Sequence, residues 1–498
     1  MFEKINKLID RIGVYLLALG AVILNISLAF DNVVWGDEAY SQMAIIDCDF
    51  YGIFERVYYW DSHPPLYYYY LRIFADIFGY NTVVYHIASL VPFVIGIVLA
   101  VTLIKKHLGA IPAVFFIIVS GFSASCSEYN LEIRMYSLVF MFTLLCAYCA
   151  YMIIKEGGKL SYFILMTLFG VLSAYTHYYG LAVCGLIIFF AGFVNFAGNK
   201  NKKAFFKWFL TTVIYIVVYI PWLFVLYFQT QAELGNSWMT EPDAFDRILN
   251  FITGGENLRP VMLTFVIVMT IVILIKESGL ATIKKGEEKV SFYLALHKPS
   301  RKNWSCELKG ILFFYVVIAL LLGFGYGVSY LFHPILTYRY TYVLIPLVLF
   351  IFMLCMKRLI EYNFNLRAKY IIVYVMLLAT LIISLFDFKY FRSLSKTQDI
   401  ETKKVLDIVG TPNEDAVLVS NGVKHLAWSV LKYYYPNEVT TENPNKLGKE
   451  PSEIWAFIGD TFDNDVLNDM KKMGYKHEAY MNMWLGKYAI NLYHFYRE

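Results

Sequence analysis

The chain has 498 residues, of which 58% are hydrophobic, 18% aromatic and only 16% charged, and its mean hydropathy is +0.53. This is more apolar surface than a soluble core can bury, so the composition excludes a soluble enzyme and predicts a polytopic membrane protein. The net charge of +4 is small, and the basic residues form no patch, which gives nucleic-acid binding no support. The seven cysteines show no metal-ligand spacing.

Apolar runs of roughly 17 to 25 residues, the length that crosses a bilayer as a helix, recur along the first 387 residues. We place eleven spans, at 12–30, 83–104, 110–126, 134–154, 161–177, 180–197, 208–228, 259–276, 310–331, 340–357 and 370–387. No small-residue cleavage site follows the first run, so it is interpreted as a retained span and not as a removed signal peptide.

The distribution of basic residues gives the expected orientation. With the N-terminus in the cytoplasm, about 23 Lys and Arg residues fall in the inner loops and six in the outer segments before residue 388. Inner loops of membrane proteins carry this excess. We therefore expect a multi-pass plasma-membrane protein whose N-terminus is cytoplasmic and whose tail is extracytoplasmic.

The first outer loop, 31–82, contains two polar islands between apolar runs. The first is Trp35-Gly36-Asp37-Glu38-Ala39-Tyr40 and the second is Trp60-Asp61-Ser62-His63-Pro64-Pro65-Leu66-Tyr67. Charge kept beside hydrocarbon usually marks a working site, although helix capping is the simpler reading of Asp37. The two prolines hold an extended corner, and helical spacing at 39–46 and 66–78 predicts interfacial helices.

The last 111 residues have a different composition from the rest of the chain. Apolar runs at 416–419, 454–458 and 488–495 predict strands with helix-capable segments between them. The predicted organisation is a helical membrane domain, 1–387, followed by an extracytoplasmic α/β domain, 388–498. We expect this tail to close over the outer cavity while the chemistry stays in the membrane domain.

Carboxylates and arginines on one membrane face fit a reaction that needs a base for a nucleophile and a cation for an anionic leaving group. A lipid-linked sugar phosphate makes that demand, because its phosphate leaves already negative and a guanidinium grips it with two donors. Arg134 and Arg339 each stand at the start of a span. The alternative is that these arginines only anchor the chain at the interface.

The order of several motifs resembles the bacterial relatives of protein O-mannosyltransferases, which belong to the C-type superfamily of polyprenyl-phosphate-sugar glycosyltransferases together with the aminoarabinose transferases of lipid A. The motifs are the first-loop acidic pair, Asp-x-His-Pro-Pro-Leu-Tyr, Glu-Ile-Arg-Met-Tyr-Ser-Leu at 132–138, Thr-His-Tyr-Tyr-Gly, Ile220-Pro221-Trp222 and Tyr338-Arg339-Tyr340. The likeness is best over residues 30–230. It implies about eleven transmembrane helices in the C-type fold.

The resemblance also implies roles for single residues. Asp37 matches the acid that deprotonates the acceptor hydroxyl, Glu38 would help hold the acceptor, and Asp61 matches the second loop motif. The remaining candidates are Arg134 and Arg339 for the donor phosphate, and His63, Glu132, Tyr136 and His177 for shaping the site or binding the acceptor.

Two departures from the family pattern bear on the substrate and on metal use. Met135 stands where relatives often have proline, and the β-trefoil insert of eukaryotic protein-acceptor enzymes is missing, which argues against a protein acceptor. No cofactor is expected. A divalent metal held by Asp37, Glu38, Asp61, His63 and His177 is the alternative, although none of these residues has ligand spacing.

The predicted function is transfer of one hexose or pentose from a polyprenyl-phosphate carrier to an extracytoplasmic glycan, lipid or protein acceptor, with inversion. The main rival is a transporter or flippase of lipid-linked saccharides. A flippase would place its charges deeper within the spans and would not need paired first-loop acids. A third interpretation is a sensor whose tail binds a cell-wall ligand while the spans only anchor it. Eleven spans are more than such an anchor needs.

Overall fold

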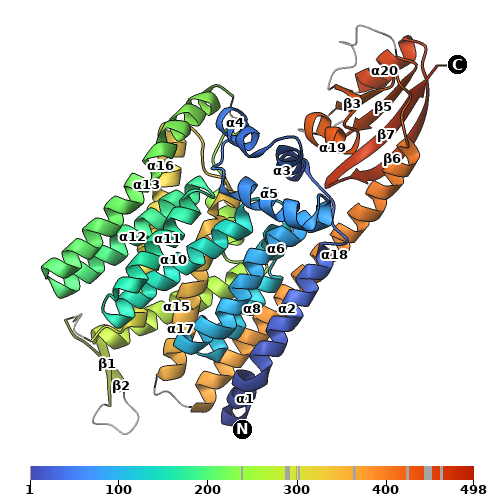
Figure 1. The fold of residues 1–498 in the computed structure, drawn as a ribbon. Coiled ribbons are helices and arrows are strands. Elements are labelled where there is room, and N and C mark those ends of the chain that lie inside the picture. Colours follow the sequence, from blue (N-terminus) through green and yellow to red (C-terminus); the bar gives the residue numbers. More distant parts are fainter. Residues whose placement is uncertain are drawn as a thin grey trace.

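The fold is seen in a computed structural model that describes residues 2–236, 239–285, 292–298, 300, 303–362, 366–421, 426–441, 451–459 and 464–497. Figure 1 shows a long bundle of helices with a small sheet domain at one end and the N-terminus at the other. The bundle helices are α1 (Phe2–Leu8), α2 (Val14–Leu28), α6 (Thr82–Leu99), α7 (Lys105–Leu108), α8 (Ala110–Phe122), α9 (Ala124–Leu131), α10 (Tyr136–Glu156), α11 (Leu160–Ala174), α12 (Tyr178–Asn199), α13 (Lys202–Asn236), α14 (Phe245–Ile252), α15 (Arg259–Ser278), α16 (Cys306–Leu331), α17 (Ile345–Glu361) and α18 (Leu366–Val409).

Ten of the eleven predicted spans each fall on one helical stretch, and 110–126 falls on α8 and the start of α9. In the described part of the chain, nine helical stretches are long and apolar enough to cross a membrane, and α8 with α9 forms a tenth that bends by 65°. The eleventh, α11, has only 15 residues. At 1.5 Å per residue it is about 22 Å long, shorter than the roughly 30 Å hydrocarbon core.

The bend between α8 and α9 positions the functional end of the bundle. Ser123 ends α8 in an extended conformation, and its side chain caps α9 by accepting a hydrogen bond from Cys126 N at 3.4 Å. The loop after α14 packs into the break through Gly254 and Gly255, whose φ angles are +96° and +132°. The segment that follows α9, residues 132–135, is a buried turn that leads into α10.

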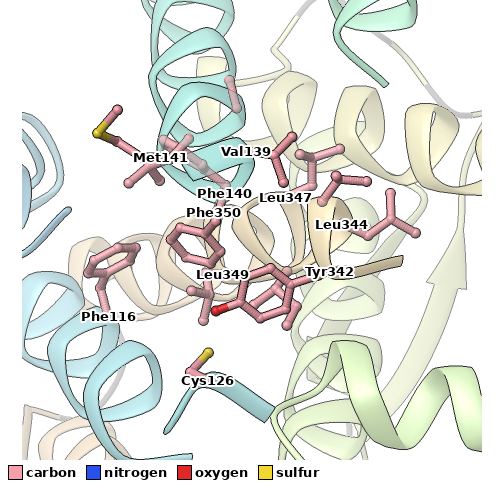
Figure 2. Close-up of a cluster of buried hydrophobic side chains, with 14 of the residues drawn as sticks. Phe116, Cys126, Val139, Phe140, Met141, Tyr342, Leu344, Leu347, Leu349 and Phe350 are labelled. Carbon is pink, nitrogen blue, oxygen red and sulfur yellow. The ribbon is translucent and has the colours of Figure 1, made fainter. Parts of the chain in front are cut away.

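The bundle core lies around α10 and α17, the two helices that other helices cover on most sides. Part of it is drawn in Figure 2. The ring centre of Phe140 in α10 lies 6.5 Å from that of Phe116 in α8 and 5.5 Å from that of Tyr342. Tyr342, in the 3-10 turn Tyr338–Leu344 that leads into α17, donates a hydrogen bond to Asn130 of α9 at 3.2 Å. Apolar residues all round a helix are what a central position requires.

The predicted first outer loop forms three helices, α3 (Gly36–Ile46), α4 (Phe50–Trp60) and α5 (Leu66–Phe78). The prediction gave α3 and α5 but not α4. The Pro64-Pro65 corner precedes α5 directly, and the loop is tied to the bundle where Leu66 N donates to Tyr175 O at 3.1 Å. All three helices lie at the end of the bundle that also carries the sheet domain (Figure 1).

The last helix differs from the prediction, because it does not stop near Phe388. α18 continues to Val409 and carries the chain from the bundle into the sheet domain. That domain has a five-stranded sheet in the order β4-β3-β5-β7-β6. Its elements are β3 (Val417–Asn421), α19 (Lys432–Tyr434), β4 (Val439–Thr441), β5 (Glu453–Ile458), α20 (Asn464–Lys472), β6 (Lys476–Leu485) and β7 (Tyr488–Tyr496). The strands β3, β5 and β7 are those that the sequence predicted.

The opposite end of the bundle holds ion pairs made by the predicted inner loops. Lys105 lies 3.3 Å from Asp10, Lys357 lies 2.5 Å from Glu307, and Arg358 lies 2.6 Å from Glu277. The hairpin of β1 (Ala281–Lys285) and β2 (Phe292–Leu296) extends from this end.

Candidate active site

The first acidic island forms the start of α3. Glu38 is fully buried, and its carboxylate accepts from Trp35 N at 3.2 Å and from Ile133 N at 2.9 Å. It thereby closes the first turn of α3 and ties that turn to the segment after α9. Sequence analysis assigned Glu38 to the acceptor, whereas its contacts are those of a residue that fixes the position of its neighbours.

Asp37, unlike the buried Glu38, has 35% of its side chain exposed. Arg339 Nη1 donates to Asp37 Oδ2 at 3.0 Å. The guanidinium also lies over the Trp35 ring, 5.4 Å from its centroid. Asp37, the candidate base, and Arg339, a candidate for binding the donor phosphate, are therefore in direct contact, although 302 positions separate them in the chain.

The second island forms a buried cluster. His63 Nδ1 lies 2.7 Å from Asp61 Oδ1, and Tyr68 of α5 donates to Asp61 Oδ2. Burial alone would raise the pKa of Asp61, but the charges of His63 and Arg134 and the hydrogen bonds lower it to about 2. Asp61 is thus a fixed anion and not a proton carrier at neutral pH.

Arg134 completes this cluster from the turn between α9 and α10. It is 4% exposed, and its Nη1 donates to Tyr68 Oη at 2.9 Å and to Ser41 Oγ at 3.2 Å. Its Nη2 lies 3.4 Å from His63 Nδ1. Among the described residues, its Nε has no hydrogen-bond partner. A buried donor without a partner is costly, which suggests a ligand.

His177 caps the start of α12 and faces the same cluster. Its Nδ1 accepts from Tyr179 N at 3.1 Å, so the neutral ring carries its proton on Nε2. Burial, together with His63 and Arg134, lowers the pKa of His177 well below its ordinary value. The Nε2 donor has no partner in the described part of the chain, and the ring centre is 5.4 Å from that of His63.

Glu132 and Tyr136 lie between the two islands. Glu132 Oε1 accepts from Trp35 Nε1 at 3.0 Å. Burial raises the pKa of Glu132 strongly, and Lys487 and Arg339 oppose that shift. The Tyr136 ring packs 6.1 Å from His177. Every predicted site residue therefore lies at one end of the bundle, in two neighbouring groups of side chains. One group holds Asp37, Glu38, Glu132 and Arg339, and the other holds Asp61, His63, Arg134, Tyr136 and His177.

Several contributors to this set were missed by sequence analysis. Tyr68 and Ser41 lie on the predicted helices 66–78 and 39–46, and both accept hydrogen bonds from Arg134. Lys487 and Tyr488 come from the tip of the β6–β7 hairpin and reach Glu38 and Gly36. The motif Leu485-Gly486-Lys487 indicates a hairpin turn, but no local pattern reveals which segment it contacts.

The donor set offers limited support for a metal. Among the described residues, no three His, Cys, Asp or Glu side chains are placed to share an ion. Asp61 and His63 are paired with each other, and both Glu38 oxygens accept backbone hydrogen bonds.

Comparisons with known proteins agree with this architecture. Residues 62–224 match the family model described as dolichyl-phosphate-mannose-protein mannosyltransferase. This range includes His63, Arg134 and His177, whereas Asp37 precedes it. No curated protein matches the chain.

The chain is also similar to two crystal structures of ArnT from Cupriavidus metallidurans. The apo form has a TM-score of 0.57 at 10% identity, covering 97% of this chain and 98% of that one. The form bound to undecaprenyl phosphate has a TM-score of 0.55 at 11% identity, covering 96% and 97%. The family match and the shared fold together confirm the resemblance of this polytopic membrane protein, with its C-terminal α/β domain, to the C-type glycosyltransferase superfamily.

Proposed function

We propose that this protein transfers one sugar from a polyprenyl-phosphate carrier to an acceptor hydroxyl on the extracytoplasmic side of the membrane. The sugar is a hexose or a pentose, and the acceptor is a glycan, a lipid or a protein. The matched family model and the shared fold support a transferase with this class of donor. The polyprenyl part of the donor rests on the undecaprenyl phosphate bound in the related structure.

The observation that carries the proposal is the pair of buried N–H donors beside His63. In the described residues, Arg134 Nε and His177 Nε2 both lack partners, although both side chains are nearly fully buried. A phosphate supplies the oxygens that such donors need, and a charged donor strengthens each bond. The half-exposed Asp37 lies at the same end of the bundle, where it can meet an acceptor.

The chemistry follows from these positions. Asp37 removes the proton of the acceptor hydroxyl as its oxygen bonds to the anomeric carbon. The bond from that carbon to the phosphate oxygen breaks, and the electron pair leaves with the lipid phosphate. Arg134 and Arg339 stabilise the charge that develops there. A single displacement of this kind inverts the anomeric carbon.

The distribution of basic residues supports our proposal that the site faces the extracytoplasmic side. The basic loops lie at the end of the bundle that holds the N-terminus, and the site lies at the other end. Basic loops face the cytoplasm in most membrane proteins.

The proposal includes no metal, because a phosphate that leaves as an anion needs no Lewis acid when two guanidinium groups face it. We expect transfer to survive a chelator such as EDTA. Activity abolished by EDTA and restored by Mn²⁺ or Mg²⁺ would favour the metal alternative.

Binding of undecaprenyl phosphate to the purified protein tests the donor site. Native mass spectrometry of the protein in detergent should show a bound lipid phosphate that Arg134→Gln loses. Arg247→Gln is the matched control, since Arg247 is 59% exposed, pairs with Asp243 and lies over the Tyr338 ring. In the described part of the chain, Arg247 has no hydrogen bond or ion pair with Arg134 or His177. Equal binding by both variants would contradict the assigned site, and lipid exchange between leaflets without sugar transfer would favour a flippase.

A further inference from the structure

The tip of the β6–β7 hairpin belongs to the C-terminal domain but packs into the first outer loop. Gly486 has a φ of +60°, and a Cβ built on it would lie 2.1 Å from Val34 O. Gly486 N donates to Thr402 Oγ1 of α18 at 2.9 Å, which holds the tip in place. Only glycine permits this approach of two backbones.

Lys487 follows this glycine and enters a group of carboxylates. Its Nζ is 3.5 Å from Glu38 Oε2 and 4.0 Å from Glu128 Oε1. Burial alone would lower the pKa of Lys487, but Glu132 lies close enough for its carboxylate to help raise it. Glu38 and Glu132 are 0% and 2% exposed. Buried carboxylates need a compensating cation, and here the C-terminal domain supplies one.

The Tyr488 side chain contacts the backbone of the same first-loop segment. Its hydroxyl accepts from Gly36 N at 3.0 Å, and this amide is the first of α3. An unpaired amide at a helix start needs an acceptor, and a residue more than 450 positions away provides it. The next residue along α3 is Asp37.

The contacts continue from Lys487 to the candidate base. Lys487 neutralises Glu38, which caps Trp35 N, and Glu132 accepts from Trp35 Nε1. Arg339 lies over the Trp35 ring and donates to Asp37.

The two parts also share an apolar core. Val34 and Ala39 of the first loop are buried in the same cluster as Leu418, Trp455 and Leu485 of the sheet domain. Tyr433 of α19 adds a hydrogen bond to Thr82 at 2.5 Å. This interface is therefore continuous with the core of the domain and is not a loose contact.

We propose that the β6–β7 hairpin tip is a positioning element of the active site, in which Lys487 and Tyr488 hold the first turn of α3 so that Asp37 meets the acceptor. The C-terminal domain is then part of the catalytic unit and not a separable acceptor-binding module. The inference depends on the proposed role of Asp37 as base.

The first test measures structure and needs no activity. Hydrogen exchange of the full-length protein in nanodiscs is followed in peptides covering residues 33–41. Tyr488→Phe and Lys487→Met should speed exchange there about 3- to 10-fold, the effect of losing one hydrogen bond or ion pair. Lys476→Met, at the exposed far end of β6, is the control and should change nothing there. Unchanged exchange in both hairpin variants would overturn the proposal.

The second test measures turnover in cells, as the ratio of polyprenyl-phosphate monosaccharide to free polyprenyl phosphate. Lys487→Met should lower turnover about 10- to 100-fold, the effect of misplacing a catalytic group by about 1 Å. Undecaprenyl phosphate binding should stay unchanged, and Lys487→Arg should restore turnover. A merely structural defect would weaken binding as well.

The outcomes separate the two proposals. If wild type and Asp37→Asn give the same lipid ratios, the proposed function fails. The exchange experiment still decides whether the hairpin tip holds the first turn of α3. If Asp37→Asn is inactive but Lys487→Met turns over normally despite faster exchange, the hairpin does not position the base, and the inference is wrong.

Discussion

Arg134 and Arg339 are the two residues to which we assign recognition of the donor phosphate. Arg134 is held by Tyr68 and Ser41, and Arg339 by Asp37 and the Trp35 ring. Their planar donors are preset, which a lysine cannot reproduce with a single point charge.

We therefore expect Arg134→Lys and Arg339→Lys each to weaken use of the donor about 10-fold or more, although both keep the positive charge. The measurement is undecaprenyl phosphate affinity for Arg134→Lys, and the cellular lipid-linked sugar ratio for both. Arg247→Lys serves as control. Two fully active lysine variants would mean that the arginines are interface anchors.

Asp61 gives a prediction with a defined pH dependence. Its pKa is lowered from 3.8 to about 2, so the ionised carboxylate stabilises the fold above pH 4 by about 2 kcal/mol. That stability is lost as the pH falls through about 2. Asp61→Asn should lower the thermal midpoint at pH 7, and the difference from wild type should shrink as the pH falls from 4 toward 2. A difference that stays constant over this range would contradict an ionised, buried Asp61.

The sequence located most of these residues because charge beside apolar runs is conspicuous. Asp37, Asp61, His63, Arg134 and His177 were all singled out in this way. Lys487 was not, because its partners are hundreds of positions away and a lysine at a hairpin tip resembles any exposed lysine.

Among the elements, the bend between α8 and α9 lies directly before the part of the site that carries Glu132 and Arg134. It directs the chain into the turn that carries Glu132 and Arg134, and the loop containing Gly254 and Gly255 supports it. Sequence analysis treated 110–126 as one straight span, since its apolar run contains no proline or charge at the break. A hydrogen bond from Ser125 N to Gly254 O helps to hold the bent form, and this long-range contact leaves no local signal.

Gly255→Ala tests this element. The glycine has a φ of +132°, and an added Cβ would lie 3.0 Å from Ala124 Cβ. We expect a loss of about 1 to 3 kcal/mol in stability, seen as a lower thermal midpoint, together with weaker undecaprenyl phosphate binding. Gly327→Ala is the control, because that glycine lies inside α16 with nothing within 4 Å of the added atom. Equal behaviour of the two variants would contradict the role of the break.

Two other elements show where sequence patterns were insufficient. α4 was missed although Asp49 is a clear N-cap, accepting from Gly52 N at 2.7 Å. β6 was missed because it is an edge strand in which half of the residues are exposed, so it lacks a regular apolar alternation. In contrast, β3, β5 and β7 carry apolar runs and were predicted.

At the scale of the whole molecule, the basic loops and the site lie at opposite ends of the bundle. This separation predicts that the basic loops face the cytoplasm and that the site faces outward. Asn199→Cys lies at the basic end and Asn437→Cys in the sheet domain, and both positions are exposed. A membrane-impermeant maleimide should label Asn437→Cys in intact cells and Asn199→Cys only after lysis. The parent protein sets the background, since five of its free cysteines are buried. The reverse labelling pattern would place the site in the cytoplasm.

The central claim is that Asp37 drives transfer from a lipid-linked sugar, and one measurement tests it most directly. Mass spectrometry of lipid-linked sugars and envelope glycans compares cells that carry wild type with cells that carry Asp37→Asn at equal abundance. Loss of a general base slows transfer about 100- to 10,000-fold. We expect a polyprenyl-phosphate monosaccharide to accumulate in the variant and one sugar to disappear from an envelope glycan or lipid. Identical lipid and glycan profiles in the two strains would contradict the account.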